Sequence, residues 1–139
     1  MGCDIHLHTE IKIHGRWEHY GHPNMERCYP LFARMAGVRN YSGLEQIAPL
    51  RGLPADVTLV TRMDWHRSPE DWHSPSWLGS REIEELEDWL NDQLGEESCN
   101  LGNKYWGYLF DCSWAGFRKY PGETPEGIED VRFVFWFDD

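Results

Sequence analysis

The sequence predicts an α+β fold, in which a small, mostly antiparallel sheet has an N-terminal hairpin and a C-terminal strand, with helices packed on it. Three observations lead to this class. Apolar and polar residues alternate over residues 3–13, an amphipathic helical pattern covers about residues 80–94, and an apolar run occupies residues 131–137. The length of 139 residues fits a single domain, 1–139, that is large enough to bury one core.

The N-terminal alternation over residues 3–13 is typical of a half-buried strand. Residues 14–15 offer a turn, and residues 16–20 offer the return strand of a hairpin. The register is open at this point. A two-residue turn puts His19 beside Glu10 on the polar face, whereas a three-residue turn moves His19 to the other face.

A short helix is expected from Tyr29 to Ala36, with Pro30 in its first turn and Gly37 as its stop signal. The stretch 38–71 contains many glycines and prolines and is expected to be mostly irregular. Within it, only residues 57–61 have the pattern of a strand. Loops of this length inside a small domain are often functional.

The clearest helix is predicted over about residues 80–94, with Ser80 as its N-cap. The face opposite its apolar stripe is acidic, which suits either a solvated surface or a docking surface. Residues 103–120 are aromatic and glycine-rich and predict a helix or a loop followed by a helix, and residues 121–125 predict turns. The run 131–137 is apolar on both alternating faces, so we expect a central strand that is covered on both sides.

Charge and composition exclude several classes of function. The net charge is −11, with 24 acidic against 13 basic residues and no basic run, which argues against binding of duplex nucleic acid. An acidic surface suits a basic protein partner or solubility. The four cysteines form no C-x-x-C pair, so we expect reduced thiols in a cytoplasmic protein. The apolar stretches are too short to cross a membrane.

Four polar side chains follow one another on one face of the first strand: Asp4, His6, His8 and Glu10. Successive members lie about 6.7 Å apart, so they can converge on one ion. Imidazole and carboxylate groups suit a divalent transition metal such as zinc or manganese. We therefore take Asp4, His6 and His8 as metal ligands and Glu10 as a general base, against the alternative of an ordinary polar strand.

Other polar residues could complete such a site. The further candidates are His19, His22, Asp64, His66, Asp71 and His73. We expect His73 to act as an additional ligand or catalytic group. Arg51 and Arg39 could each hold an anion bidentately or pair with a nearby carboxylate, and Asn40 and Trp77 are candidate substrate contacts.

The opening D-I-H-L-H-T, residues 4–9, resembles the D-x-H-x-H-T motif of the PHP (polymerase and histidinol phosphatase) phosphoesterases. In that family such residues bind a catalytic metal cluster. The family's barrel needs a much longer chain with several later ligand motifs. Here only Asp64 and His66 have a counterpart, and they occur too early in the sequence, so the resemblance is local.

Over nearly its full length the chain resembles a group of small phage and prophage proteins. The resemblance lies in MGCDIH, LFARMAGVRN, RGLP, HSPSWL and the terminal VRFVFWFDD. It implies a phage-derived protein of the host cell cytosol, where genes of this size often encode inhibitors of host defence, nucleotide-processing enzymes or small regulators. It also implies that Asp4, His6 and Glu10 carry more weight than His8.

These observations lead to three hypotheses. The first is a metal-dependent hydrolase, a phosphoesterase that acts on a nucleotide or on a substrate derived from nucleic acid. The second is a non-enzymatic acidic protein that binds a host defence protein. The third is a protein that sequesters a small nucleotide signal without cleaving it.

Overall fold

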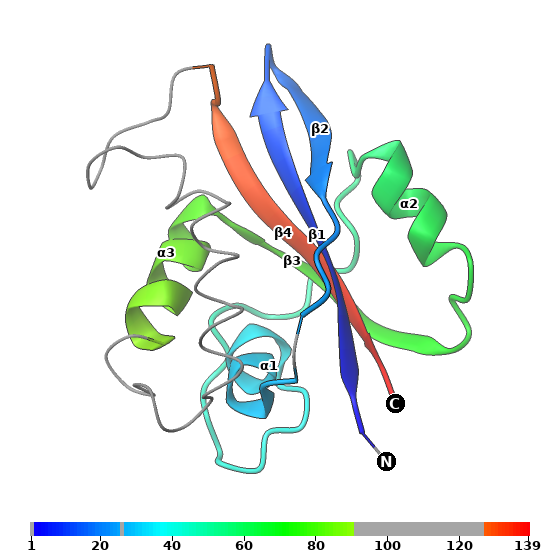
Figure 1. Cartoon of the computed structure of the whole chain (residues 1–139). Coiled ribbons are helices and arrows are strands. Elements are labelled where there is room, and N and C mark those ends of the chain that lie inside the picture. The colour runs from blue at the N-terminus through cyan, green and yellow to red at the C-terminus, as the bar shows by residue number, and fades with distance from the viewer. Residues whose placement is uncertain (1, 26, 91–126) are drawn as a thin grey trace.

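The structure is a computed structural model, which describes residues 2–25, 27–90 and 127–139. In this part of the chain, four strands form one antiparallel sheet of order β2-β1-β4-β3, accompanied by three helices, so the predicted α+β class is confirmed (Figure 1). In chain order the elements are β1 (Asp4–Ile13), β2 (Arg16–Gly21), α1 (Tyr29–Ala36), α2 (Leu59–Trp65), β3 (Trp72–Gly79), α3 (Ser80–Trp89) and β4 (Asp130–Asp138).

The N-terminal hairpin has the two-residue turn. Ile13 pairs with Arg16, and the turn residues His14 and Gly15 both have positive φ, 52° and 73°. Two such residues in succession characterise the type I′ turn that matches the twist of a hairpin. This register places His19 opposite Glu10, on the polar face of the sheet.

Strand β4 is central, as its apolar run predicts. It pairs with β1 along nearly its whole length and with β3 on its other side, and residues 131–137 are all buried. Helix α1 also has the predicted bounds, and Gly37 ends it in the left-handed conformation with a φ of 69°.

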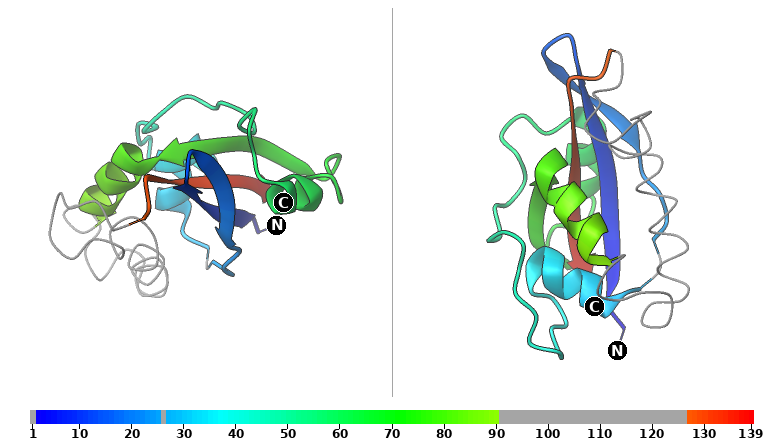
Figure 2. Two further views of the ribbon diagram at one scale, coloured as in Figure 1. Left: turned by 90° about the horizontal axis from the view of Figure 1, so that it is seen from above. Right: turned by 90° about the vertical axis from the view of Figure 1, so that its left-hand side faces the viewer.

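The two faces of the sheet differ. On one face, Leu7, Phe133 and Phe135 belong to a large apolar core that includes residues of α1 and α3. These two helices lie next to each other, and α2 lies apart from them (Figure 1 and Figure 2). On the other face, Val134 and Trp136 form a smaller cluster with Val57 and half-buried tryptophans. The polar residues of β1 point to this second face.

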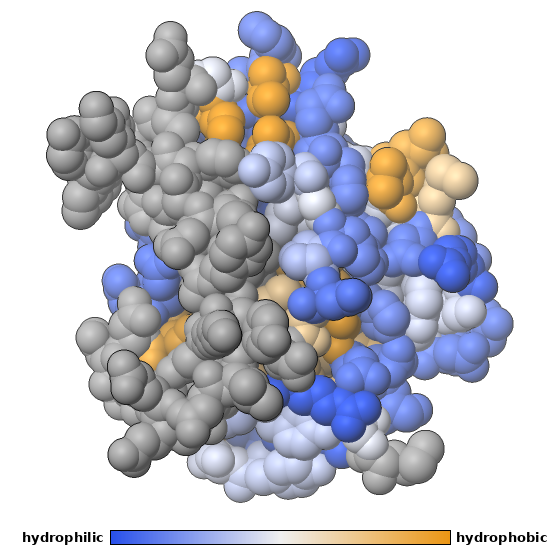
Figure 3. Space-filling model, viewed as in Figure 1, coloured by the Kyte–Doolittle hydropathy of each residue, from blue (hydrophilic) through white to orange (hydrophobic). Residues whose placement is uncertain are grey.

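Helix α2 occupies the stretch for which a strand was predicted at residues 57–61, so that prediction is wrong. The alternation there does not mark two faces of a sheet, because Leu59, Val60 and Met63 are 67%, 51% and 61% exposed. They form an apolar patch on the surface of α2 (Figure 3). The anchoring side chain of the helix is instead the buried Thr61.

Strand β3 was not predicted, because it contains Pro75 and several polar residues. Proline is tolerated at the edge of a sheet or in a bulge, and β3 offers both. Its pairing with β4 is irregular between His73 and Ser76, where Ser74 has a φ of 56°. This irregularity determines where His73 lies.

Helix α3 follows β3 directly, and its N-cap is Gly79 rather than the predicted Ser80. The Glu82 side chain accepts a hydrogen bond from the Gly79 N–H at 2.9 Å. The end of the helix predicted over residues 80–94, the aromatic stretch 103–120 and the turns at 121–125 lie outside the described residues.

The described cysteines differ in redox state. Cys3 is a free, buried thiol, as expected, whereas Cys28 is disulfide-bonded. The prediction of reduced thiols is therefore wrong for Cys28. No helix in the described ranges is long and apolar enough to cross a membrane.

Candidate metal centre

The polar face of β1 meets histidines and a carboxylate from three other segments. Strand β2 contributes His19, the loop after β2 contributes His22, and helix α2 contributes Asp64. All three contact His8. This histidine cluster, defined as His6, His8, His19, His22 and Asp64, gathers residues that are up to 58 positions apart in the printed sequence.

His8 lies at the centre of the histidine cluster, and its side chain is only 2% exposed. Its Nε2 lies 2.8 Å from an Asp64 oxygen, and its Nδ1 lies 2.9 Å from His19 Nε2. Nδ1 of His22 lies 2.7 Å from His8 Nε2 and 3.2 Å from His8 Nδ1. Both nitrogens of one imidazole are therefore contacted twice.

The contacts at the two ring nitrogens of His8 differ. A neutral imidazole carries one N–H, and an ionised carboxylate only accepts. If His8 donates through Nε2 to Asp64, its Nδ1 can accept from His19, and an unprotonated His22 Nδ1 can accept from the same Nε2–H. A cation on the Nε2 side could instead take lone pairs from His8, His22 and Asp64, whereas His19 lies at the opposite nitrogen. Imidazole nitrogen and carboxylate oxygen are suitable ligands for zinc, manganese, iron or nickel.

Burial keeps these histidines in the form that binds metal. It lowers the pKa of His8 to about 4, even though the hydrogen bond that Asp64 accepts from His8 acts in the opposite direction. Burial also lowers the pKa values of His19 and His22. All three rings are therefore neutral at pH 7, with lone pairs available to an ion.

His6 adjoins this group from the start of β1. Its Nε2 lies 2.5 Å from an oxygen of Asp138, on the neighbouring strand β4, and its ring packs against Trp72 and Trp136, which also stack on each other. One ligand atom each from His6, His22 and Asp64 lie within 4.8 Å of one another. A carboxylate behind a histidine ligand fixes the orientation of its ring, which is the arrangement common in metal sites.

The histidine cluster is open on one side. The side chain of His22 is 38% exposed and that of His6 is 27% exposed, while His8 is covered. His6 and His22 are therefore the members of the cluster that solvent can reach.

Asp4, predicted as a ligand, does not join the histidines. Its exposed carboxylate accepts a hydrogen bond from Arg27 at 2.7 Å, which lowers the pKa of Asp4. His8, which the resemblance to phage proteins gives less weight, is instead the central residue. Of the further candidates, the structure brings His19, His22 and Asp64 to the cluster.

Glu10, predicted as the base, is fully buried beneath α2. One oxygen accepts from Arg132 at 2.7 Å, and the other accepts from Thr58 and Thr61. Both carboxylate oxygens are thus occupied by donors from the protein. Glu10 therefore forms a buried ion pair with Arg132 of β4 and holds α2 against the sheet through its hydrogen bonds with Thr58 and Thr61.

Arg51 and Trp77 lie together. The guanidinium of Arg51 stacks 4.3 Å from the centre of the Trp77 ring and also binds Glu82. Both residues line a hollow of about 430 Å³, together with Trp17 and Arg132. Trp77 on β3 and His8 on β1 pair with the same residue of β4, Val134, from opposite sides.

The remaining predicted residues lie elsewhere. Arg39 and His73 both bind Asp139, near the end of β4. Asn40 is hydrogen-bonded through its side chain to the backbone of Leu44, so it holds a loop. Asp138 was not predicted, because its proximity to His6 depends on the pairing of β1 with β4.

Comparisons with protein-family models, with curated proteins and with solved structures found no match for the chain. The interpretation of the site therefore depends on the geometry of its residues.

The low pKa of His8 makes the metal-free protein sensitive to acid. The ring is neutral when folded and is protonated in the unfolded chain below its ordinary pKa of 6.5. Unfolding therefore takes up a proton between pH 6.5 and about 4, so stability falls as the pH falls through this window. We expect this group to contribute on the order of 3 kcal/mol at pH 7 that is lost by pH 4.

Urea unfolding of wild-type protein and of His8→Gln in chelator, at several pH values from 4 to 7, measures this contribution. The difference in unfolding free energy between the two proteins should rise with pH. Parallel profiles would show that burial does not depress the pKa of His8.

The buried ion pair between Glu10 and Arg132 gives a second prediction. Glu10→Ala leaves the guanidinium of Arg132, whose side chain is 5% exposed, without its buried partner. We expect Arg132→Ala to lower the free energy of unfolding by about 3–5 kcal/mol, because it leaves the buried Glu10 carboxylate without a cation. Glu10→Ala should cost less, because Asp56 still pairs with the Arg132 guanidinium at 2.8 Å. The double variant should lose less than the sum of the two in urea unfolding. Additive losses would contradict a direct interaction.

Proposed function

We propose that the histidine cluster binds a divalent transition metal ion and that the protein is a metal-dependent hydrolase. The observation that carries the proposal is the group on the Nε2 side of His8. Ligand atoms of His6, His22 and Asp64 lie within 4.8 Å of one another, and His8 Nε2 lies 2.7 Å from His22 Nδ1 and 2.8 Å from an Asp64 oxygen. Strand β1, the loop after β2 and helix α2 supply these groups.

The surrounding residues suit hydrolysis. When bound, such an ion supplies a Lewis acid and lowers the pKa of a water ligand toward neutrality. His6 borders the exposed side of the cluster and can serve as a further ligand, with Asp138 at 2.5 Å from its Nε2 orienting the ring.

A small phosphoester, such as a nucleotide, is the substrate class that we propose. Arg67 lies at the rim of the cluster, with its guanidinium 3.3 Å from an Asp64 oxygen and a side chain that is 77% exposed. It can pair with a phosphate while Asp64 turns to the ion. The net charge of −11 disfavours binding of a long polyanion. Arg67 and the bound metal ion would still attract a small anion locally.

The resemblance to phage and prophage proteins supports a role in the cytosol of an infected cell. Substrates of the proposed class, nucleotides, are abundant there. The disulfide at Cys28 is uncommon in that compartment, so the state of this cysteine in cells tests the assignment.

A second candidate function is binding of a host protein. It is favoured by the exposed apolar patch on α2, formed by Leu59, Val60 and Met63 (Figure 3). The acidic face of α3, with exposed Glu85 and Asp88, would then attract a basic partner. Charge reversal at Glu84, Glu85 and Asp88 should abolish such binding, and retained binding would exclude this surface.

Metal analysis of the purified full chain tests the first proposal. His22→Asn removes a half-exposed loop ligand with little risk to folding, and we expect it to lower bound zinc or manganese by about one equivalent per chain. His14→Asn is the matched control, because the same change is made in an exposed turn where asparagine tolerates positive φ. Plasma mass spectrometry measures both proteins.

Hydrolysis of bis-p-nitrophenyl phosphate completes the test. Activity should require added metal, fall at least tenfold in His22→Asn and persist in His14→Asn. Equal metal content in the two variants would exclude the histidine cluster as the binding site. Metal loss without any hydrolytic activity in the wild type would leave metal binding in place and exclude this reaction, and a tightly retained nucleotide would then favour sequestration.

A further inference from the structure

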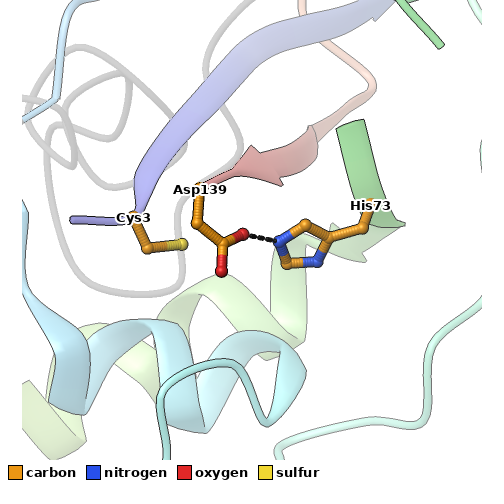
Figure 4. A group of neighbouring side chains, drawn as sticks. All are labelled: Cys3, His73 and Asp139. Carbon is orange, nitrogen blue, oxygen red and sulfur yellow. Dashed lines mark hydrogen bonds and ion pairs between the residues drawn. The ribbon is translucent and has the colours of Figure 1, made fainter. Parts of the chain in front are cut away.

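A second group of metal-ligating side chains lies where β1 begins and β4 ends. Cys3 precedes β1, His73 belongs to β3 and Asp139 follows β4. One ligand atom from each of the three lies within 4.8 Å of the others. The carboxylate of Asp139 points into the space between the Cys3 sulfur and the His73 ring (Figure 4).

Each of the two carboxylate oxygens of Asp139 contacts one side chain. Asp139 accepts a hydrogen bond from Arg39 through Oδ2 at 3.1 Å, while its Oδ1 faces Nε2 of His73. The other ring nitrogen of His73, Nδ1, lies 2.9 Å from the hydroxyl of Ser74. The Asp139 carboxylate is thus shared between the Arg39 guanidinium and the His73 ring, and it lies within reach of the Cys3 sulfur.

We propose that Cys3, His73 and Asp139 form a second metal site, selective for a thiophilic divalent ion such as zinc. A thiolate, an imidazole and a carboxylate are three protein ligands that suit tetrahedral zinc and leave one position for water or substrate. Thiolate distinguishes this site from the histidine cluster, which contains no sulfur. The proposal does not depend on the hydrolase function.

The same geometry argues against a cysteine nucleophile. In such an enzyme the imidazole stands next to the thiol and activates it. Here the carboxylate of Asp139 lies between the Cys3 sulfur and the His73 ring (Figure 4), and the Cys3 side chain is fully buried. Burial and the nearby negative charge raise the pKa of the Cys3 thiol. A divalent cation reverses this effect, because it stabilises the thiolate directly.

Two residues that contact this group have an unusual backbone conformation. Ser74 and Arg39, the residues that hold His73 and Asp139, have φ values of 56° and 50°. Such conformations are strained in non-glycine residues and tend to occur where function requires them. The bulge at Ser74 lets the edge strand present His73 to the end of β4.

Cobalt binding to the metal-free full chain tests the proposal, because a Co²⁺–thiolate bond gives a near-ultraviolet charge-transfer band that imidazole and carboxylate ligands do not give. We expect the band to appear in the wild-type protein, to disappear in Cys3→Ser and to persist in His8→Gln. His73→Asn, at a more exposed position, should weaken cobalt binding at this site at least tenfold, with His14→Asn as its matched control.

Circular dichroism establishes whether each variant is folded. If Cys3→Ser does not fold, the effect of His73→Asn on cobalt binding tests the second site. Cobalt binding without the band, or a band retained in folded Cys3→Ser, would overturn the second site. A substitution in the histidine cluster, such as His8→Gln, should lower the amount of bound metal without removing the thiolate band. The two sites are therefore tested independently of each other.

Discussion

The buried carboxylate of Glu10 is the constraint on which the position of α2 depends. It accepts from Arg132 of β4 and from Thr58 and Thr61 at the start of α2, so it joins sheet and helix. Asp64 lies one turn beyond Thr61, about 4.5 Å along the helix axis. His8 lies two residues before Glu10, about 6.7 Å along the strand. Because both distances are short, the hydrogen bond from Thr61 to Glu10 brings Asp64 within reach of His8, 2.8 Å from its Nε2.

The sequence predicts those parts of the fold whose pattern is local. Alternation marks β1, a proline and a glycine delimit α1, and an apolar run marks β4 as a central strand. Two elements break their local rules. Helix α2 carries β-branched residues and an exposed apolar face, and β3 contains a proline that only its bulge and edge position accommodate.

The candidate site is predictable to the same extent. His6 and His8 follow from the alternation of β1, and His19 follows once the turn is known to have two residues. Asp64 needs a helix in a stretch that the sequence predicts to be irregular, and Asp138 needs the register between β1 and β4. These positions are set by tertiary packing, so no local pattern specifies them.

Strand geometry links the two proposed metal sites. Successive residues of a strand point to opposite faces, so neighbours in the sequence are divided between the sites. Asp138 binds His6 on the face of the histidine cluster, whereas Asp139 binds His73. A slip of β4 by one residue would exchange these carboxylates and would also move Phe135 out of the large core and Trp136 into it. The burial that stabilises the fold therefore fixes the register that each site requires.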